Sequence, residues 1–288
     1  MQKPSDPSQG ENTYMLDAES AAEMARLTNQ DILITKIMGG LLPERPDFSN
    51  IHRVLDIACG PGGWALEIAF AHPDIEVVGV DSSRTMIEYA RAQAQVQGLD
   101  NASFKVMDVL KPLDFPADSF DLVNVRLVGG FMSPMRWPTF VQECVQVARP
   151  GGLIRLTETD NMGRTNSPAL EKLWEVGIQA LQLTGRTFTP EERDFGTTLR
   201  LRKFLRDAGC QNIKMTPHVI DFSAGTEAHE SMCRNWMIAL KLGQPFLVKV
   251  GVTTQEEAER LYQQAMAEMM SNDFCSIWYL LTACGEKP

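Results

Sequence analysis

The sequence predicts an α/β protein built around a mostly parallel sheet. Its length of 288 residues exceeds one typical domain and falls short of two, which favours one α/β domain carrying insertions. Its composition, with 44% apolar and 22% charged residues, is typical of a globular protein. From Arg53 onward, short apolar runs alternate with helical stretches. This alternation indicates strand, helix and strand units whose sheet is covered on both faces.

Five strands are readable between Arg53 and Glu158. They are expected at VLDIA, EVVGV, SFKVMDV, DLVNV and LIRLTE. Helices are expected from Gly63, from Ser82 to Gln97, around Thr139 to Ala148, from Pro168 to Leu183 and from Thr197 to Ala208. Two further strands, IKMTPHVIDF and SIWYLLTAC, are expected near the end of the chain.

The residues before the first strand form a separate segment. Residues 1 to about 13 are rich in Pro, Ser and Gly and are expected to be disordered. From Asp17 to Met38 apolar residues recur at helical spacing, and Gly39 and Gly40 suit a helix stop. The predicted division is a tail and N-terminal helical cap at 1–50, and a main domain at 51–288 with helical insertions at about 160–208 and 226–271.

The net charge, the cysteines and the N-terminus indicate which kinds of partner the protein lacks. A net charge of -10 gives no general source of phosphate neutralisation, so no nucleic-acid partner is expected. The six cysteines are scattered, without the spacing of metal ligands, so no metal site is expected. The polar N-terminus does not resemble a signal peptide, and no window approaches the roughly 20 apolar residues of a membrane helix. We therefore expect a cytoplasmic protein without a membrane partner.

The segment VLDIACGPGG, from Val54 to Gly63, is the most informative part of the sequence. An apolar strand ends in Asp56, a glycine-rich turn follows, and a helix begins at once, so backbone N–H groups come close to a ligand. The residues GPGGWA also satisfy the G-x-G-x-x-G/A pattern of dinucleotide-binding proteins. This segment alone leaves the kind of nucleotide open.

Acidic residues end the next two strands. Asp81 follows EVVGV, where a carboxylate accepts the ribose hydroxyls of a bound nucleoside. Asp108 ends FKVMD in the following strand. Both acids also suit a structural role, because acids at strand ends often cap helices or stabilise turns.

Five motifs in order resemble the signature of class I methyltransferases that use S-adenosyl-L-methionine (SAM). They are LDIACGPG, GVDSS, VMD, FDLV and ARPGG, across residues 54–152. One departure is Ala58, which stands where the family usually has its first glycine. The resemblance implies a Rossmann-like, seven-stranded, mostly parallel sheet with the last strand antiparallel and with helical cap insertions. It also implies SAM as cofactor, bound at the carboxyl ends of the strands.

The resemblance assigns cofactor contacts position by position. Those expected along the methionine part are Asp56, Ala58, Gly60 and Gly62. Those expected along the ribose and adenine are Asp81, Ser82, Met86, Asp108 and Val109. Asn124 and Arg126 are expected at the methionine carboxylate or the transfer site. The N-terminal stretch looks like the pre-domain helix of small-molecule methyltransferases. By this analogy, Tyr14 and Gln30 would touch SAM.

The acceptor is expected to be small and largely apolar. The insertions carry many Met and aromatic side chains, a composition typical of a core and also of an apolar ligand site. The predicted reaction is therefore methylation of a natural-product-like molecule on oxygen, carbon or nitrogen. The catalytic candidates are Glu158 as general base, His229 as a second base and Arg126 as electrostatic helper. Asp160 and His218 are further candidate bases, and each of these residues also has a structural interpretation.

Other functions stay open at this point. An NAD-dependent oxidoreductase shares the glycine turn and Asp81, but no YxxxK motif is present. A SAM-binding protein that does not methylate, such as a regulatory subunit or a pericyclase, would keep the same cofactor motifs. A nucleic-acid methylase is disfavoured because NVRL stands in place of an NPPY-type motif. We expect a monomer or a homodimer.

Overall fold

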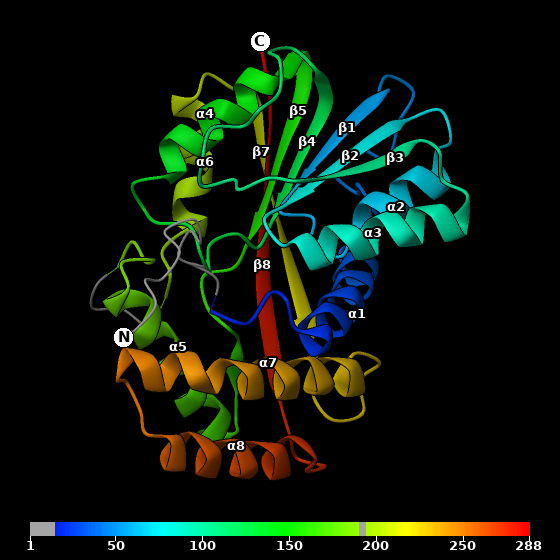
Figure 1. Ribbon diagram of the computed structural model, residues 1–288. Helices are drawn as coiled ribbons and strands as arrows, with labels where there is room; N and C mark the ends of the chain where they lie inside the picture. Colours follow the sequence, from blue (N-terminus) through cyan, green and yellow to red (C-terminus); the bar gives the residue numbers. More distant parts are fainter. Residues whose placement is uncertain (1–14, 190–193) are drawn as a thin grey trace, which may run out of the picture.

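One continuous sheet runs through the part of the protein that the structure describes (Figure 1). The computed structural model describes residues 15–189 and 194–288, so Tyr14 lies outside the described residues. The strands are β1 (Arg53–Ile57), β2 (Glu76–Asp81), β3 (Ala102–Val106), β4 (Phe120–Arg126), β5 (Ala148–Glu158), β6 (Arg164–Thr165), β7 (Gln211–Asp221) and β8 (Ser276–Glu286).

The strand order is β3-β2-β1-β4-β5-β8-β7, with the short β6 beside β8 on the same side as β5. Strands β3, β2, β1, β4 and β5 are mutually parallel, and β8 runs antiparallel to both β5 and β7. This arrangement confirms the predicted seven-stranded sheet with its last strand antiparallel. The two-residue β6 is an additional strand that the sequence did not predict.

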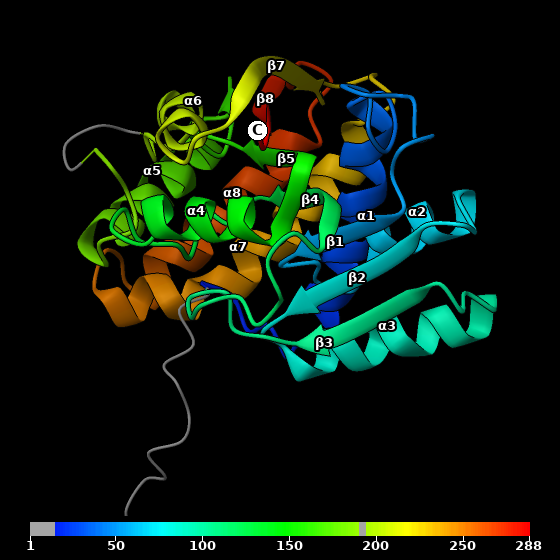
Figure 2. The ribbon, with the colours of Figure 1, turned by 90° about the horizontal axis from the view of Figure 1, so that it is seen from above.

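Helices cover both faces of the sheet. They are α1 (Ala21–Ile37), α2 (Gly63–Ala71), α3 (Arg84–Gln97), α4 (Trp137–Val147), α5 (Pro168–Leu183), α6 (Thr198–Asp207), α7 (His229–Val250) and α8 (Gln255–Met269). Figure 2 shows α4 and α6 on one side of the sheet and α1 and α2 on the other. The central strands are therefore buried on both faces, which explains their nearly continuous runs of Val, Leu and Ile.

A second apolar core lies under the helical cap. Helices α1, α5, α7 and α8 pack on one another at one end of the sheet (Figure 1). Their core contains Trp174 from α5, Trp236 from α7 and Trp278 from β8, whose rings meet edge to face. Helix α6 does not join this cap but packs on α4. The insertion predicted at about 160–208 therefore supplies α5 to the cap and α6 to the layer that contains α4.

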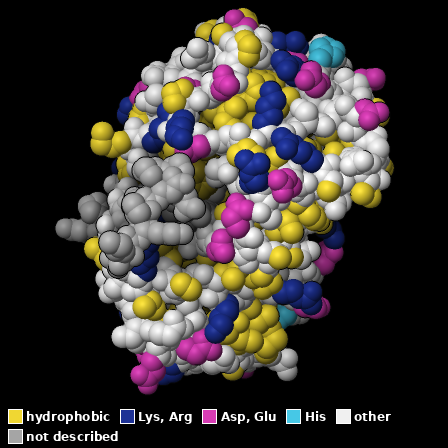
Figure 3. All heavy atoms as spheres, viewed as in Figure 1, with side chains coloured by type: hydrophobic (Ala, Val, Ile, Leu, Met, Phe, Trp, Pro, Cys, Tyr) yellow, Lys and Arg dark blue, Asp and Glu magenta, His cyan; other side chains and the backbone are white. Residues whose placement is uncertain are grey.

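Two surface properties bear on possible partners. On the face shown in Figure 3, basic side chains are interspersed with acidic ones rather than gathered in one extended patch. No helix among the described residues combines the length and the apolar character that crossing a bilayer requires.

Candidate functional site

A pocket of about 690 Å³ lies at the carboxyl ends of β1, β2 and β4 and is closed on one side by α1. Strand β1 is the point where the strand order reverses, with β2 on one side and β4 on the other. Open α/β sheets bind their ligands in the crevice at this point. The pocket is therefore the candidate functional site.

The turn between β1 and α2 forms one wall of the pocket. Ala58, Gly60 and Gly62 have φ angles of 56°, 52° and 83°, all in the left-handed region. This conformation explains why glycine is expected at position 58, where alanine costs about 1 to 2 kcal/mol of strain. Ala58 and Gly60 line the pocket, whereas Gly62 does not. Gly62 shapes the turn, and its predicted contact with the cofactor stays a prediction.

Gly62 also allows α2 to pack closely on its neighbours. A Cβ atom at this position would lie 2.8 Å from Phe104 and 2.9 Å from Ala90, whereas a Cβ atom on Gly98, with φ of 66°, would meet nothing within 4 Å. We expect Gly98→Ala to lower the free energy of unfolding by about 1 to 2 kcal/mol through strain alone. Gly62→Ala should cost about 2 to 4 kcal/mol, since overpacking is added to that strain. Urea unfolding of both variants measures the difference, and equal losses would contradict the packing argument.

Asp81 connects the glycine turn to the next helix. Its Oδ2 accepts a hydrogen bond from the backbone N–H of Gly60 at 2.9 Å, and its Oδ1 accepts one from Ser83 at 2.9 Å. Burial raises the pKa of Asp81, and these hydrogen bonds oppose that rise. Asp81 therefore stabilises the turn, and it also lines the pocket, where it is available to a ligand.

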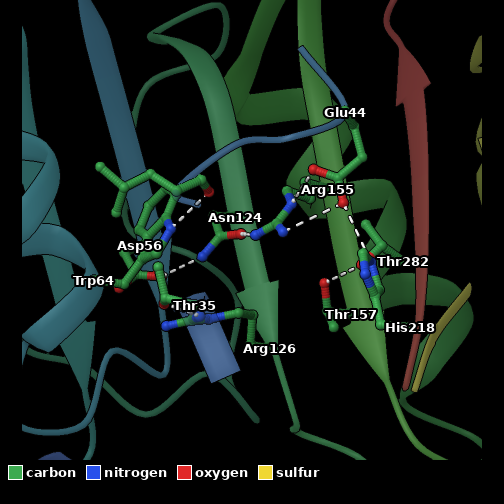
Figure 4. A network of polar contacts seen from close by, with 11 residues as sticks. Thr35, Glu44, Asp56, Trp64, Asn124, Arg126, Arg155, Thr157, His218 and Thr282 are labelled. Atoms are coloured by element: carbon green, nitrogen blue, oxygen red, sulfur yellow. Dashed lines mark hydrogen bonds and ion pairs between the residues drawn. The ribbon is translucent and has the colours of Figure 1, made fainter. Parts of the chain in front are cut away.

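Asp56 is the buried acid at the end of β1. Its Oδ1 accepts a hydrogen bond from Asn124 at 2.8 Å (Figure 4). Burial raises its pKa to about 7, against the opposing charge of Arg126. Asn124 is fully buried and does not line the pocket. Asn124 orients Asp56, which does line the pocket, and the predicted position of Asn124 at the methionine carboxylate or the transfer site stays a prediction.

The polar contacts continue from Asn124 across the sheet (Figure 4). Arg155 donates to Asn124 at 3.0 Å and to Glu44 at 3.1 Å. Although burial acts in the opposite direction, the hydrogen bond from His218 and the charge of Arg155 lower the pKa of Glu44 to about 2. Glu44 lies between α1 and β1, so this network fixes the connection from the cap to the sheet.

At the other end of the pocket lie Ser82, Met86, Asp108 and Val109, all predicted cofactor contacts. The Asp108 carboxylate accepts from the N–H of Leu110 at 3.0 Å. Glu19 lines the same region and was missed from the sequence. Its carboxylate accepts a hydrogen bond from the Ser83 hydroxyl at 2.8 Å and another from the Thr85 hydroxyl, which joins the segment before α1 to the start of α3.

Arg126 ends β4 and lines the pocket. It forms an ion pair with Asp31 and donates to the Thr35 hydroxyl at 3.1 Å, so two residues of α1 hold it. Gln30 also lines the pocket, and its Oε1 accepts from Arg26 at 2.6 Å. Asp31 was missed from the sequence, although it follows Gln30 directly.

The predicted general bases do not line the pocket. Glu158 is buried, and it accepts hydrogen bonds from Val128 N–H at 2.7 Å and from Gly129 N–H at 3.2 Å. Burial raises its pKa to about 8. The His229 ring lies 3.0 Å from the Phe222 carbonyl oxygen at the start of α7. Glu158 and His229 thus make structural contacts outside the pocket lining, and their catalytic roles stay predictions.

The other candidate bases also make structural contacts. Asp160 accepts from the N–H of Thr198 at 3.0 Å, at the start of α6, and His218 belongs to the network around Glu44. The described residues contain no group of three or more His, Cys, Asp or Glu side chains arranged to hold a metal ion.

Comparison with known proteins agrees with this geometry. Residues 54–152 match the family described as Methyltransferase domain. An uncharacterized methyltransferase of Bacillus subtilis, YcgJ, is 34% identical over 119 residues, which are 41% of this chain and 45% of YcgJ. The crystal structure of YcgJ superimposes with a TM-score of 0.51 over 83% of this chain and 93% of that chain, at 17% identity.

Two further relatives cover more of the chain. Methyltransferase str2 of Strobilurus tenacellus is 24% identical over 277 residues, covering 92% of this chain and 94% of its own length. Demethylmenaquinone methyltransferase of Geobacillus kaustophilus is 26% identical over 181 residues, covering 60% of this chain and 76% of its own length. The similarity to str2 extends beyond the methyltransferase motifs into the cap.

Proposed function

Because the chain belongs to the class I methyltransferases that use SAM, we propose that its pocket holds SAM and that it methylates a small, largely apolar acceptor. The observation that carries the proposal is the convergence of Asp56, Asp81 and Asp108 on one pocket beside a glycine turn. These acids lie at or just after the carboxyl ends of three neighbouring strands, and they suit the ammonium, ribose and adenine groups of one SAM molecule.

The pocket divides by chemistry into parts that suit the parts of SAM. Asp81 supplies the carboxylate for the ribose hydroxyls, next to Ser82 and Met86. Asp108 and Val109 face the adenine. Asp56, Ala58, Gly60 and Arg126 surround the methionine part, where Arg126 complements the carboxylate of the cofactor. When bound, SAM supplies an already activated methyl group, so the protein has mainly to orient the acceptor and to exclude water.

The remaining lining residues support an apolar acceptor. Leu27 and Ile34 come from α1, and Leu127 and Phe131 come from the loop after β4. Apolar walls with a few polar groups are typical of sites for small organic molecules. The relative from Geobacillus kaustophilus is named for demethylmenaquinone, an acceptor of this character. We propose a natural-product-like acceptor and no nucleic-acid partner, and a monomer or a homodimer.

An acceptor panel tests this proposal. The purified protein is incubated with SAM and with matched phenols, naphthoquinols, carbonyl compounds with acidic C–H groups, amines and a DNA duplex, and formation of S-adenosylhomocysteine (SAH) is measured. We expect turnover with an apolar member of the panel and none with DNA. Binding of SAM without turnover of any small molecule would favour a SAM-binding protein that does not methylate. Turnover restricted to DNA would contradict the proposed acceptor.

A further inference from the structure

We propose that Asp31 makes the pocket prefer the positively charged donor SAM over the spent product SAH. This inference rests on the proposed SAM site and goes beyond it, because it assigns the choice between donor and product to one residue of the cap. SAM carries a sulfonium charge that SAH has lost, while the rest of the two molecules is the same. A carboxylate near the sulfur therefore attracts SAM more strongly than SAH.

The position of Asp31 is set by contacts with two other elements. It lies on α1 and lines the pocket. It pairs with Arg126 at the end of β4, and the two side chains are 17% and 13% exposed. Its Oδ2 also lies against the start of α2, so a Cβ atom on Gly63 would displace the Asp31 carboxylate. Asp31 therefore lies where α1, α2 and β4 meet, at the methionine end of the proposed cofactor site.

The charges at this end of the pocket come from two acids and one lining cation. The acids are Asp31 and Asp56, the lining cation is Arg126, and the charge of Arg155 also acts on Asp56 from outside the lining. Of the other lining cations, Arg26 makes a buried ion pair with Glu23 at 2.6 Å, and Lys111 lies 3.6 Å from Asp108 at the adenine end. Once the ligand carboxylate occupies Arg126, a sulfonium charge compensates the carboxylate of Asp31, whereas a neutral thioether does not.

The field of Asp31 reaches the surrounding groups. Together with burial, which is the larger cause, its charge raises the pKa of Glu67 on α2. It also adds to burial in raising the pKa of Asp56. These effects place the negative charge of Asp31 within electrostatic reach of the methionine end, not only of its partner Arg126.

Binding of SAM is expected to give Arg126 a new partner in place of Asp31. In this structure Arg126 is paired with Asp31. The carboxylate of SAM complements Arg126, which leaves Asp31 to face the ammonium and sulfonium charges. After methyl transfer the sulfonium charge is gone, so the attraction to Asp31 weakens and release of the product is favoured.

Calorimetric titration of the full chain tests this inference. The ligands are SAM, SAH and sinefungin, a SAM analogue with a protonated amine in place of the methylsulfonium group. Asp31→Asn should raise the dissociation constants of SAM and sinefungin about tenfold and that of SAH by less than about threefold. Asp31→Glu, which keeps the carboxylate, should restore much of the preference.

The control is Glu76→Gln, which removes an exposed negative charge at the start of β2, outside the pocket, and should leave the ratio of the dissociation constants of SAM and SAH unchanged. If Asp31→Asn does not fold, Asp31→Ser provides the same comparison. If Asp31→Asn weakens the binding of SAM and SAH equally, or weakens the binding of SAH more, the inference is overturned while the SAM site stands. If the unaltered protein binds neither SAM nor SAH, the proposed SAM site fails and the inference fails with it.

Discussion

Asp81→Ala is expected to weaken SAM binding at least about 100-fold, which corresponds to about 2.8 kcal/mol. The substitution removes the acceptor for the ribose hydroxyls, and hydrogen bonds to a charged group each contribute about 1.5 to 3 kcal/mol. It also removes the acceptor of the Gly60 and Ser83 N–H groups, so the glycine turn loses its support. Calorimetric titration with SAM measures the effect.

Two matched variants separate ligand binding from folding. Asp81→Asn keeps the size of the side chain and should still lose at least about tenfold in affinity, because the charge that strengthens the ribose contacts is gone. Glu76→Gln changes an exposed acid at the opposite end of β2 and should bind SAM like the unaltered protein. If Asp81→Ala folds and binds SAM within threefold of the unaltered protein, Asp81 does not hold the ribose.

Glu44→Ala is expected to lower the free energy of unfolding by about 3 to 5 kcal/mol. Glu44 and Arg155 are buried, with side chains 4% and 1% exposed. Removing the acid leaves the Arg155 charge buried, with Asn124 as its remaining neutral partner. Urea unfolding measures the loss, and lower affinity for SAM is expected as well because Asn124 orients Asp56.

Two controls distinguish the buried pair from an ordinary surface ion pair. Glu76→Ala breaks the exposed pair with Arg53 and should cost about 0 to 1 kcal/mol. The double variant Glu44→Leu with Arg155→Met removes both charges and should be more stable than Glu44→Ala alone. A loss below 1 kcal/mol for Glu44→Ala would show that the Arg155 charge is accommodated without Glu44.

The strands and the acids at their ends were predictable because their signals are local. Alternating apolar runs identify β1 to β5, and Asp56, Asp81 and Asp108 directly follow or end such runs. Parallel strands bring these ends to one edge, so three acids far apart in the sequence meet in one pocket. The side-chain environment of each acid was not part of this signal.

The functional residues contributed by the cap were missed because their contacts are not local in the sequence. Glu19, Asp31 and Glu44 are acids in or near α1, and an acid that contacts a distant helix or strand has the same sequence pattern as one in solvent. Glu158 was placed correctly at the end of β5, but the N–H groups of Val128 and Gly129 hold its carboxylate. That contact depends on the path of the loop after β4, which no local pattern specifies.

The most direct test of the SAM site is a calorimetric titration of the purified chain with SAM and, separately, with NAD. We expect one SAM site per chain with a micromolar dissociation constant and no binding of NAD, because Asp56 and Asp31 complement the charges of the methionine part. Binding of NAD without binding of SAM would contradict the account and would identify the glycine turn and Asp81 as parts of a dinucleotide site.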